Sequence, residues 1–322
     1  MRPISDVVRY IPQDALEQMR TQFSPSVYNR LLLAFRAERV TSFRVNTIKA
    51  DKSDTMIRLR KDGFKLTQIP AVKSGFFLDK NQDNKLMKHE LTVSGHIYLQ
   101  SISSMLPAEI LKPRSHANVL DIAAAPGSKT TQMAALMGNT GHIDAIEPDF
   151  IRTERLRHNC ALLGTANVVI HQTTGQKFTS ELYEVYDYIL ADVPCSGEGR
   201  FNIYDRASYL GWKKADISRL AVLQKKLATG ALQALKPGGL LLYSTCTLNC
   251  EENESVIDAL LQTHPNISII PVPGEFYQGN NTIAPFTVYQ GIRYSREVSK
   301  AMRVLPSECM EGFFICLIQK NK

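Results

Sequence analysis

Long apolar runs are missing from this sequence. The longest among its 322 residues are too short to cross a bilayer, and no hydrophobic signal segment stands at the N-terminus. We therefore expect a cytoplasmic protein without a membrane partner. The oligomeric state cannot be derived from the sequence, and a monomer is the default expectation.

A cysteine framework is missing as well. The six cysteines, at positions 160, 195, 246, 250, 309 and 316, include one close pair, Cys246 and Cys250. The second pair that a zinc site would need is lacking, so we expect no metal and no disulfide scaffold. In a reducing compartment the thiols stay free for chemistry.

Neither of the two common glycine-rich phosphate loops occurs in the sequence. It has instead a short apolar strand from Asn118 to Ile122, a turn of small residues from Ala123 to Gly127, and a helical pattern from Ser128. At such a turn the backbone can approach a ligand closely. Because no row of glycine amides could wrap a pyrophosphate, a neutral or cationic ligand such as S-adenosylmethionine suits the turn better than a dinucleotide.

The length allows about two domains, and the formal net charge of +7 weakly favours a polyanionic partner. Residues 1–95 mix helix and strand patterns, which suggests a small α+β module, with residues 80–88 as a polar loop. The basic residues of this module form either a solvated face or a surface that contacts phosphates. They are Arg36, Arg39, Arg44, Lys49, Lys52, Arg58, Arg60, Lys61, Lys65 and Lys73.

Beyond residue 96 strands alternate with helices, which is typical of a doubly wound, mostly parallel α/β sheet. Strands are expected at residues 118–122, 142–147, 168–171, 186–192, 240–244 and 312–319, and helices from 128 and at 151–163, 215–235 and 251–262. Asn249 is predicted to cap the last helix, with Glu252 completing a capping box. Glu147 ends its strand, where a carboxylate can hold ribose hydroxyls.

Ligands of such sheets bind at the carboxyl ends of the strands, so the turns after residues 122, 192 and 244 should converge. These turns carry two thiols, Cys195 and Cys246, with the carboxylate of Asp192 and the amine of Lys129. A buried cysteine is more often inert core than a nucleophile. Cys246, however, precedes the expected helix at 251–262, and the positive end of a helix lowers the pKa of a thiol.

Three motifs together resemble the RNA cytosine-C5 methyltransferases: DIAAAPGSKT from Asp121 to Thr130, DVPCSGEG from Asp192 to Gly199, and YSTCTLNCEEN from Tyr243 to Asn253. The resemblance extends to residues 42–47, 95–107, 305–306 and 312–314, and so covers most of residues 40–320. It is strongest to bacterial enzymes of small-subunit rRNA. The resemblance implies a Rossmann-like methyltransferase domain over residues 96–322, S-adenosyl-L-methionine as cofactor, and an RNA-binding module over residues 1–95.

The resemblance also implies roles for individual residues. Cys246 would attack C6 of cytosine, which makes C5 nucleophilic enough to accept a methyl group. Cys195 would assist removal of the C5 proton and release of the product. Asp192 would hydrogen-bond the base around N3 and N4, and Lys129 would also contact the base, which must leave its stack. The cofactor site would be lined by Ala123, Ala124, Ala125, Pro126, Gly127, Ser128, Lys129, Glu147, Thr174 and Asp192.

The sequence departs from the family's pattern at four positions. Ala123 stands where cysteine is usual and Ser128 where glycine is usual, but both are small. Thr174 replaces the acid that usually meets the adenine amino group; because a threonine still accepts one hydrogen bond, we expect cofactor binding. Glu311 stands where aspartate is common, with no predicted effect.

One segment and the choice of function stay open. Residues 200–214 interleave aromatic and basic side chains, which either stack on unpaired bases or pack inward. Besides a cytosine-C5 methyltransferase of rRNA or of tRNA, the sequence allows a methyltransferase of adenine or protein, and a non-catalytic RNA-binding assembly factor. The DVPC motif lacks the aromatic residue that stacks on adenine in Asp-Pro-Pro-Tyr enzymes. The presence of both cysteines and Asp192 argues against the non-catalytic factor.

Overall fold

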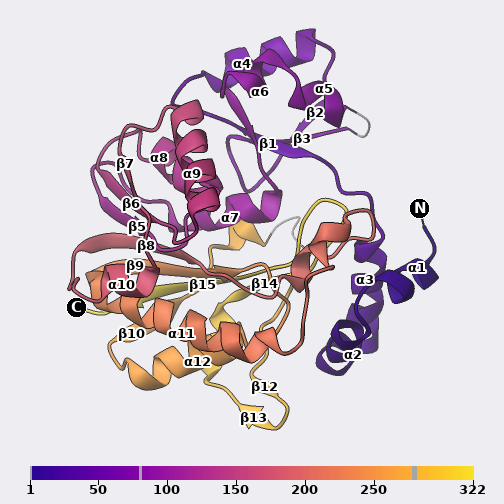
Figure 1. Ribbon diagram of the computed structural model, residues 1–322, viewed down its shortest axis with the longest axis vertical. Coiled ribbons are helices and arrows are strands. Elements are labelled where there is room, and N and C mark those ends of the chain that lie inside the picture. Colours follow the sequence, from indigo (N-terminus) through magenta and orange to yellow (C-terminus); the bar gives the residue numbers. More distant parts are fainter. Residues whose placement is uncertain (1, 80–81, 278–280) are drawn as a thin grey trace.

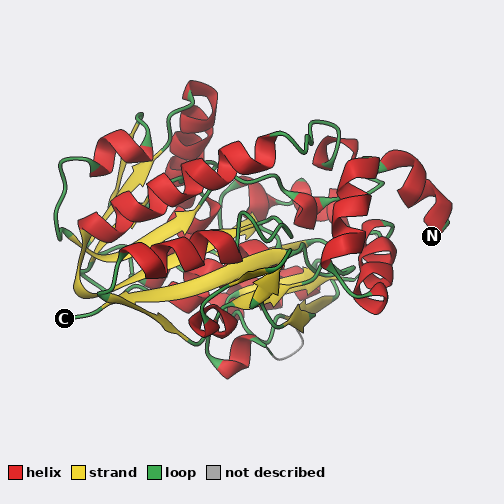
Figure 2. Ribbon diagram, turned by 90° about the horizontal axis from the view of Figure 1, so that it is seen from below, coloured by secondary structure: helices red, strands yellow, loops and turns green. Residues whose placement is uncertain are grey.

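A nine-stranded sheet organises the larger part of the chain (Figures 1 and 2). The computed structural model describes residues 2–79, 82–277 and 281–322, and over these residues the strand order is β11-β14-β15-β9-β8-β5-β6-β7, with β10 paired to β15. Five neighbouring strands are parallel: β5 (Asn118–Asp121), β6 (His142–Ile146), β7 (Val168–His171), β8 (Tyr186–Asp192) and β9 (Leu235–Thr245). Four are antiparallel: β10 (Ile267–Ile270), β11 (Thr282–Ile283), β14 (Met302–Val304) and β15 (Phe313–Lys320).

The strand order reverses between β5 and β8. From β5 the chain moves outward to β6 and β7, then returns to place β8 on the other side of β5. In sheets of this kind the ligand crevice lies beyond the carboxyl ends of the strands at such a reversal. The crevice is therefore expected beyond Asp121 and Asp192, the last residues of β5 and β8.

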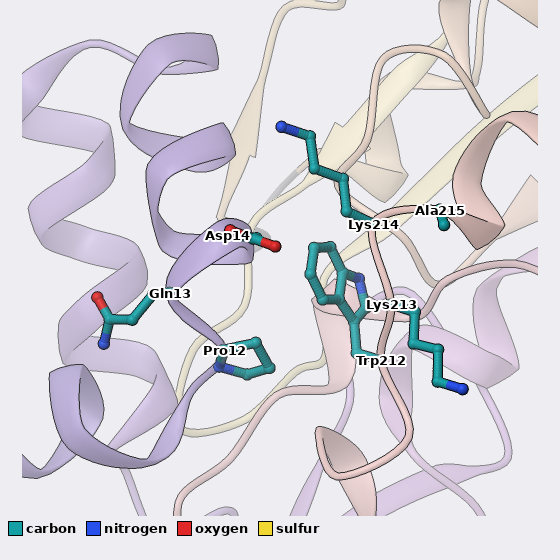
Figure 3. Close-up of a pocket in the computed structure, with 7 residues that line it drawn as sticks. All are labelled: Pro12, Gln13, Asp14, Trp212, Lys213, Lys214 and Ala215. Atoms are coloured by element: carbon teal, nitrogen blue, oxygen red, sulfur yellow. The ribbon is translucent and has the colours of Figure 1, made fainter.

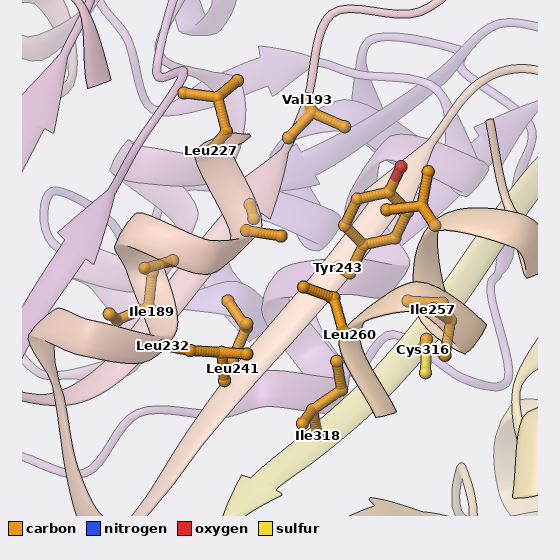
Figure 4. Close-up of a cluster of buried hydrophobic side chains, with 14 of the residues drawn as sticks. Ile189, Val193, Leu227, Leu232, Leu241, Tyr243, Ile257, Leu260, Cys316 and Ile318 are labelled. Atoms are coloured by element: carbon orange, nitrogen blue, oxygen red, sulfur yellow. The ribbon is translucent and has the colours of Figure 1, made fainter. Parts of the chain in front are cut away.

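Helices cover both faces of the sheet, as the doubly wound prediction requires. One face is covered by α10 (Gly175–Thr179), α11 (Asp216–Ala234) and α12 (Glu254–Thr263), and the other by α7 (Ile102–Leu111) and α8 (Ser128–Leu136), with α9 (Phe150–Leu163) beside α8. Under α11 and α12, Leu227 and Leu260 pack with Tyr243 of β9 and Ile318 of β15 (Figure 4). Within the described residues, no helix is both long and apolar enough to cross a membrane.

A second, antiparallel sheet of four strands is built from residues 42–99 (Figure 1). Its order is β2 (Leu66–Gln68), β3 (Gly75–Leu78), β1 (Ser42–Val45) and β4 (Ile97–Leu99), and it packs with α4 (Lys52–Lys61), α5 (Asp83–Met87) and α6 (Glu90–Val93) around Phe43 and Leu59. The first helices, α1 (Ile4–Tyr10), α2 (Gln13–Gln22) and α3 (Pro25–Phe35), pack instead against Phe201, Leu248 and Leu305 of the larger sheet's loops.

Three predicted elements differ from the structure. The polar segment 80–88 contains α5 over residues 83–87, while residues 80–81 lie outside the described chain. Strand β9 begins at Leu235 rather than at residue 240. The pairing with β8 continues across the glycines because its register shifts there, and Gly238 adopts a φ of 81°. The prediction of a capping box formed by Asn249 and Glu252 is wrong. Helix α12 begins at Glu254, and the side chain of its N-cap residue, Asn253, makes no capping hydrogen bond.

Candidate active site

The small-residue turn follows β5 directly and leads into α8. Gly127 has a φ of +100°, a conformation that side chains disfavour, and an added Cβ would lie 2.8 Å from Leu156 Cδ1. Ala124, Ala125 and Gly127 are buried, Ala123 and Ser128 are half-buried, and Pro126 is exposed. The turn therefore exposes little besides backbone at the reversal of strand order.

Asp121, the last residue of β5, is 1% exposed and unusually short of partners. Its Oδ2 accepts a hydrogen bond from Thr130 Oγ1 at 2.7 Å, whereas Oδ1 is buried with no hydrogen-bond partner among the described residues. Burial, reinforced by the nearby charge of Asp192, raises the pKa of Asp121 to about 7. An unpaired buried acceptor of this kind suits a ligand that brings a donor.

Glu147 lies one position beyond the end of β6 and is 1% exposed. Its Oε1 accepts a hydrogen bond from the Asp149 amide at 3.0 Å, and its Oε2 lies 3.4 Å from Arg152 Nη2. The same Arg152 nitrogen donates to the Ala125 carbonyl at 2.9 Å, so Arg152 ties Glu147 to the small-residue turn. The sequence reasoning missed Arg152, because only the fold brings the first turn of α9 against that carbonyl.

Thr174, the substituted position, is exposed and caps α10. Its hydroxyl oxygen accepts a hydrogen bond from the Lys177 amide at 3.3 Å. The hydroxyl proton and a second lone pair remain available to a ligand. The side chain thus has a structural task that the sequence pattern did not indicate.

The two thiols meet at the ends of neighbouring parallel strands. Cys195 follows β8, Cys246 follows β9, and their Sγ atoms lie 3.3 Å apart, with both residues half-buried. This is a hydrogen-bonding distance and not a disulfide. The hydrogen bond to Cys246, together with burial, raises the pKa of Cys195 well above its ordinary value. Cys195 therefore keeps its proton.

Lys129 and Asp192 form an ion pair next to the thiols. Lys129 Nζ lies 2.7 Å from Asp192 Oδ2 and donates to Ser104 Oγ at 2.8 Å, while Ser244 Oγ donates to Asp192 Oδ1 at 2.8 Å. Although burial lowers the pKa of Lys129, Asp192 and then Asp121 and Cys246 outweigh it, so the pKa is raised and the amine stays charged. The structure thus brings together the four residues named as catalytic.

The reason offered from the sequence for a reactive Cys246 is wrong. Because α12 begins only at Glu254, Cys246 does not stand at its positive end. Two cations, Lys129 and Arg200, interact electrostatically with Cys246. For Arg200, burial lowers the pKa, but the charges of Cys246 and Glu311 raise it above the ordinary value. Glu252, expected in the capping box, is fully buried and contacts Ser196 instead.

The aromatic residues of segment 200–214 pack inward for the most part. Phe201 and Tyr209 are buried against α1–α3, and the indole Nε1 of Trp212 donates to Glu198 Oε1 at 2.9 Å. A groove of about 740 Å³ remains outside them, between residues 12–14 and residues 212–215 (Figure 3). Lys213 and Lys214 extend from its rim and are exposed.

Arg44 departs from the expectation of a basic surface. It is 1% exposed, donates to Gln100 Oε1 at 2.9 Å and to Thr131 Oγ1 at 2.7 Å, and so connects β1 of the small sheet with α8. Burial lowers the pKa of Arg44 to about 10. In the described part of the chain, no group of three or more His, Cys, Asp or Glu residues is arranged to hold a metal ion.

Proteins of known identity resemble this chain over nearly its whole length. The family described as 16S rRNA methyltransferase RsmB/F matches residues 108–319, and the N-terminal domain of 16S rRNA methyltransferase RsmF matches residues 11–101. Relatives include the ribosomal RNA small subunit methyltransferases F of Klebsiella pneumoniae (strain 342) and Escherichia coli O7:K1 (strain IAI39 / ExPEC). Each is 36% identical over 321 residues, covering 97% of this chain and 64% of the relative. The chain thus spans less than two thirds of their length.

Solved structures agree with this assignment. A methyltransferase homologue from Pyrococcus horikoshii superimposes with a TM-score of 0.83 at 32% identity, covering 99% of this chain and 100% of that one. NSun6 from the same organism, solved with SFG, gives a TM-score of 0.79 at 22% identity, covering 98% and 100%, and shows the shared fold. On these matches, and with the motifs assembled at the sheet reversal, the chain belongs to the RsmB/F family of 16S rRNA methyltransferases.

Proposed function

We propose that this chain transfers a methyl group from S-adenosylmethionine to C5 of a cytosine in small-subunit ribosomal RNA. The observation that carries the proposal is the 3.3 Å separation of the Cys195 and Cys246 sulfurs beside the Lys129–Asp192 ion pair. The names of the 36%-identical relatives support rRNA rather than tRNA as the substrate. Such an enzyme would act in the bacterial cytoplasm, where the ribosome is.

The residues at the sheet reversal fit S-adenosylmethionine, which when bound supplies an electrophilic methyl group on a positively charged sulfur. Asp121 offers a buried oxygen that has no partner within the described part of the chain, and the tight packing at Gly127 leaves room for backbone only. Glu147 would hold ribose hydroxyls with the lone pairs that Asp149 and Arg152 leave free. NSun6, the neighbour that shares this fold, was solved with SFG, an analogue of this cofactor.

Cys246 would act as the nucleophile. Its sulfur forms a bond to C6, and the electron pair of the C5–C6 double bond moves toward C5, which can then accept the methyl group. Lys129 and Asp192 stand where they could meet the base: Asp192 retains lone pairs for the exocyclic amino group, and the Lys129 ammonium offsets charge that develops on the ring.

Cys195 would complete the reaction. The chief cause of its raised pKa is its hydrogen bond to Cys246, and bonding Cys246 to carbon ends that interaction. Cys195 can then give its thiol proton to water and, as thiolate, take the proton from C5. The electrons of the C5–H bond re-form the C5–C6 double bond, and Cys246 leaves as thiolate.

The test is transfer of a tritiated methyl group to ribosomal RNA that lacks 5-methylcytosine. Cys246→Ala should abolish both transfer and any covalent RNA adduct. Cys195→Ala should accumulate an adduct that survives denaturant, because the bond to C6 forms but is not released. Exchange of these two phenotypes would reverse the assigned roles. Transfer to tRNA alone would refute the substrate, and binding of RNA without any transfer would favour a non-catalytic assembly factor.

A further inference from the structure

Two glutamates lie buried beside the thiols and take no part in the steps above. Glu198 is 3% exposed and follows Cys195 on the turn after β8; Glu252 is 0% exposed and follows Cys246 on the turn after β9. Each turn thus carries one thiol and one buried carboxylate. Since a buried carboxylate is costly unless it is well hydrogen-bonded, its contacts indicate its task.

The contacts cross from one turn to the other. Ser196, the neighbour of Cys195, contacts Glu252 Oε1 through its hydroxyl and donates its amide to Glu252 Oε2 at 3.0 Å. Thr247, the neighbour of Cys246, contacts Glu198 Oε2 through its hydroxyl. The two hydroxyls lie 2.9 Å apart, and Ser196 Oγ is also 2.8 Å from Glu198 Oε2. Each carboxylate therefore holds the residue next to the other turn's thiol.

The hydrogen bonds of this cluster are best satisfied when one carboxylate carries a proton. Three contacts join the hydroxyl groups to the carboxylates: Ser196 with Glu198, Ser196 with Glu252, and Thr247 with Glu198. The two hydroxyls bring only two protons, which suffice when both donate to Glu198 Oε2; the 2.9 Å contact between Ser196 and Thr247 is then that of two donors sharing one acceptor. The contact between Ser196 Oγ and Glu252 then needs a third proton, which a carboxylate can carry.

The remaining hydrogen-bond partners indicate which of the two carboxylates carries the proton. Glu198 is surrounded by donors, because Trp212 Nε1 donates to its Oε1 at 2.9 Å and, among the described residues, Thr247 has no carboxylate partner other than Glu198 Oε2. Glu252 Oε2 accepts from the Ser196 amide and from Gln224 Nε2 at 2.8 Å, which leaves Oε1 as the place for a proton. Burial, and then the charge of Glu198, raise the pKa of Glu252 to about 7, which agrees with this assignment.

We propose that Glu198 and Glu252 are positioning residues, which hold the two thiols at their working distance through a proton carried by Glu252. The proposal rests on the function proposed above and adds a pH dependence to it. The titratable groups that face Glu252 are Glu198 from the same cluster, Cys195 from the turn after β8 and Tyr243 from β9. When Glu252 loses its proton, its Oε1 repels Ser196 Oγ and the link between the turns weakens.

The test compares four variants of the full chain, with a melting temperature measured for each. Glu252→Gln places an amide NH₂ where the protonated oxygen donates and a carbonyl where Oε2 accepts, so kcat at pH 7 should stay within about threefold of wild type. Glu198→Gln places an NH₂ against donors, and Glu252→Ala removes the link; both should lower kcat about 10- to 100-fold with KM little changed. Glu251→Gln is the control, because among the described residues the Glu251 side chain makes one long hydrogen bond, accepted from Ser218 Oγ at 3.4 Å.

The pH profile distinguishes positioning from a merely structural role. The ratio of kcat for Glu252→Gln to kcat for wild type should rise between pH 6 and pH 8, because only the wild-type side chain can ionise. A ratio that stays constant over this range would overturn the proton assignment. The same conclusion would follow if Glu198→Gln were tolerated and Glu252→Gln were not.

A second measurement needs neither RNA nor cofactor. Phenylarsine oxide bonds to two neighbouring thiols with loss of one water, so its affinity reports the distance between Cys195 and Cys246; Cys195→Ser identifies the site. Glu198→Gln and Glu252→Ala should bind phenylarsine oxide at least about tenfold more weakly than wild type. Because this assay contains no RNA, such a loss would show that the defect is not confined to RNA binding. Wild-type affinity and wild-type kcat in both variants would refute the positioning role. If wild type itself transfers no methyl group, the proposed function fails. The affinity for phenylarsine oxide would still show whether the two glutamates hold the thiols together.

Discussion

Replacing Asp121 by asparagine should remove a pH dependence from the stability of this protein. Asp121 is 1% exposed, and its pKa rises from 3.8 to about 7 because burial disfavours the charged form. The folded state therefore holds a proton that the unfolded chain has already lost. Its contribution to stability is fully present below pH 4 and is lost as the pH rises to about 7, with a constant penalty above.

The size of the effect follows from proton linkage. Each pH unit well below the folded-state pKa lowers the free energy of unfolding by about 1.4 kcal/mol for one additional bound proton, so the loss between pH 5 and pH 8 is about 3 kcal/mol. Asparagine does not ionise, and its Oδ1 can still accept the hydrogen bond that Thr130 now donates to Asp121. The stability of Asp121→Asn relative to wild type should therefore increase by about 3 kcal/mol across this range.

Urea unfolding at pH 5, 6, 7 and 8 measures this difference directly. Glu252, whose pKa is also raised to about 7, contributes equally to both proteins and cancels. We also expect Asp121→Asn to bind S-adenosylmethionine more weakly, because the unpartnered acceptor is lost. A difference in stability that does not change between pH 5 and pH 8 would refute the argument that Asp121 is buried without compensation.

Two further predictions concern the small-residue turn and the core beneath the Cys246 turn. Gly127→Ala combines a positive φ with a contact at 2.8 Å, so it should lower the free energy of unfolding by about 2–4 kcal/mol and weaken cofactor binding in calorimetry. The control is Gly138→Ala, where φ is also positive but no atom lies within 4 Å of the added Cβ. It should lower the free energy of unfolding by about 1 kcal/mol and leave cofactor binding unchanged. Glu254→Gln breaks the buried pair with Arg303 and should cost about 3–5 kcal/mol in urea unfolding, whereas Glu297→Gln in the exposed pair with Lys300 should cost less than about 1 kcal/mol. Equal losses in either matched pair would contradict the packing described here.

The sequence predicted the parallel strands and the meeting of the thiols because both depend on local pattern. Strands at 168–171 and 186–192 have the predicted bounds, and α9 ends one residue before Gly164, where the predicted helix also ends. Once the strand order is doubly wound, turns that follow neighbouring strands must lie together. For that reason Cys195 and Cys246 could be paired without coordinates.

What the sequence did not reveal depends on contacts between distant segments. The motif EEN after Asn249 has the spacing of a capping box, but Ser196, brought in by the turn after β8, competes successfully for Glu252. Likewise, Arg44 belongs to a part of the sequence that is rich in basic residues. Its side chain is nevertheless buried, because it donates hydrogen bonds to Gln100 and Thr131. In both cases a tertiary hydrogen bond outweighed a local preference that the residue type alone would suggest.

The central claim, that Cys246 forms a covalent bond with a cytosine in ribosomal RNA, is tested most directly with RNA that carries 5-fluorocytosine. Fluorine at C5 cannot leave as a proton does, so the adduct should persist after methyl transfer. Peptide mapping by mass spectrometry should then find the nucleotide attached to Cys246. Attachment to Cys195, or methyl transfer to normal RNA with no adduct to the fluorinated RNA, would contradict the account.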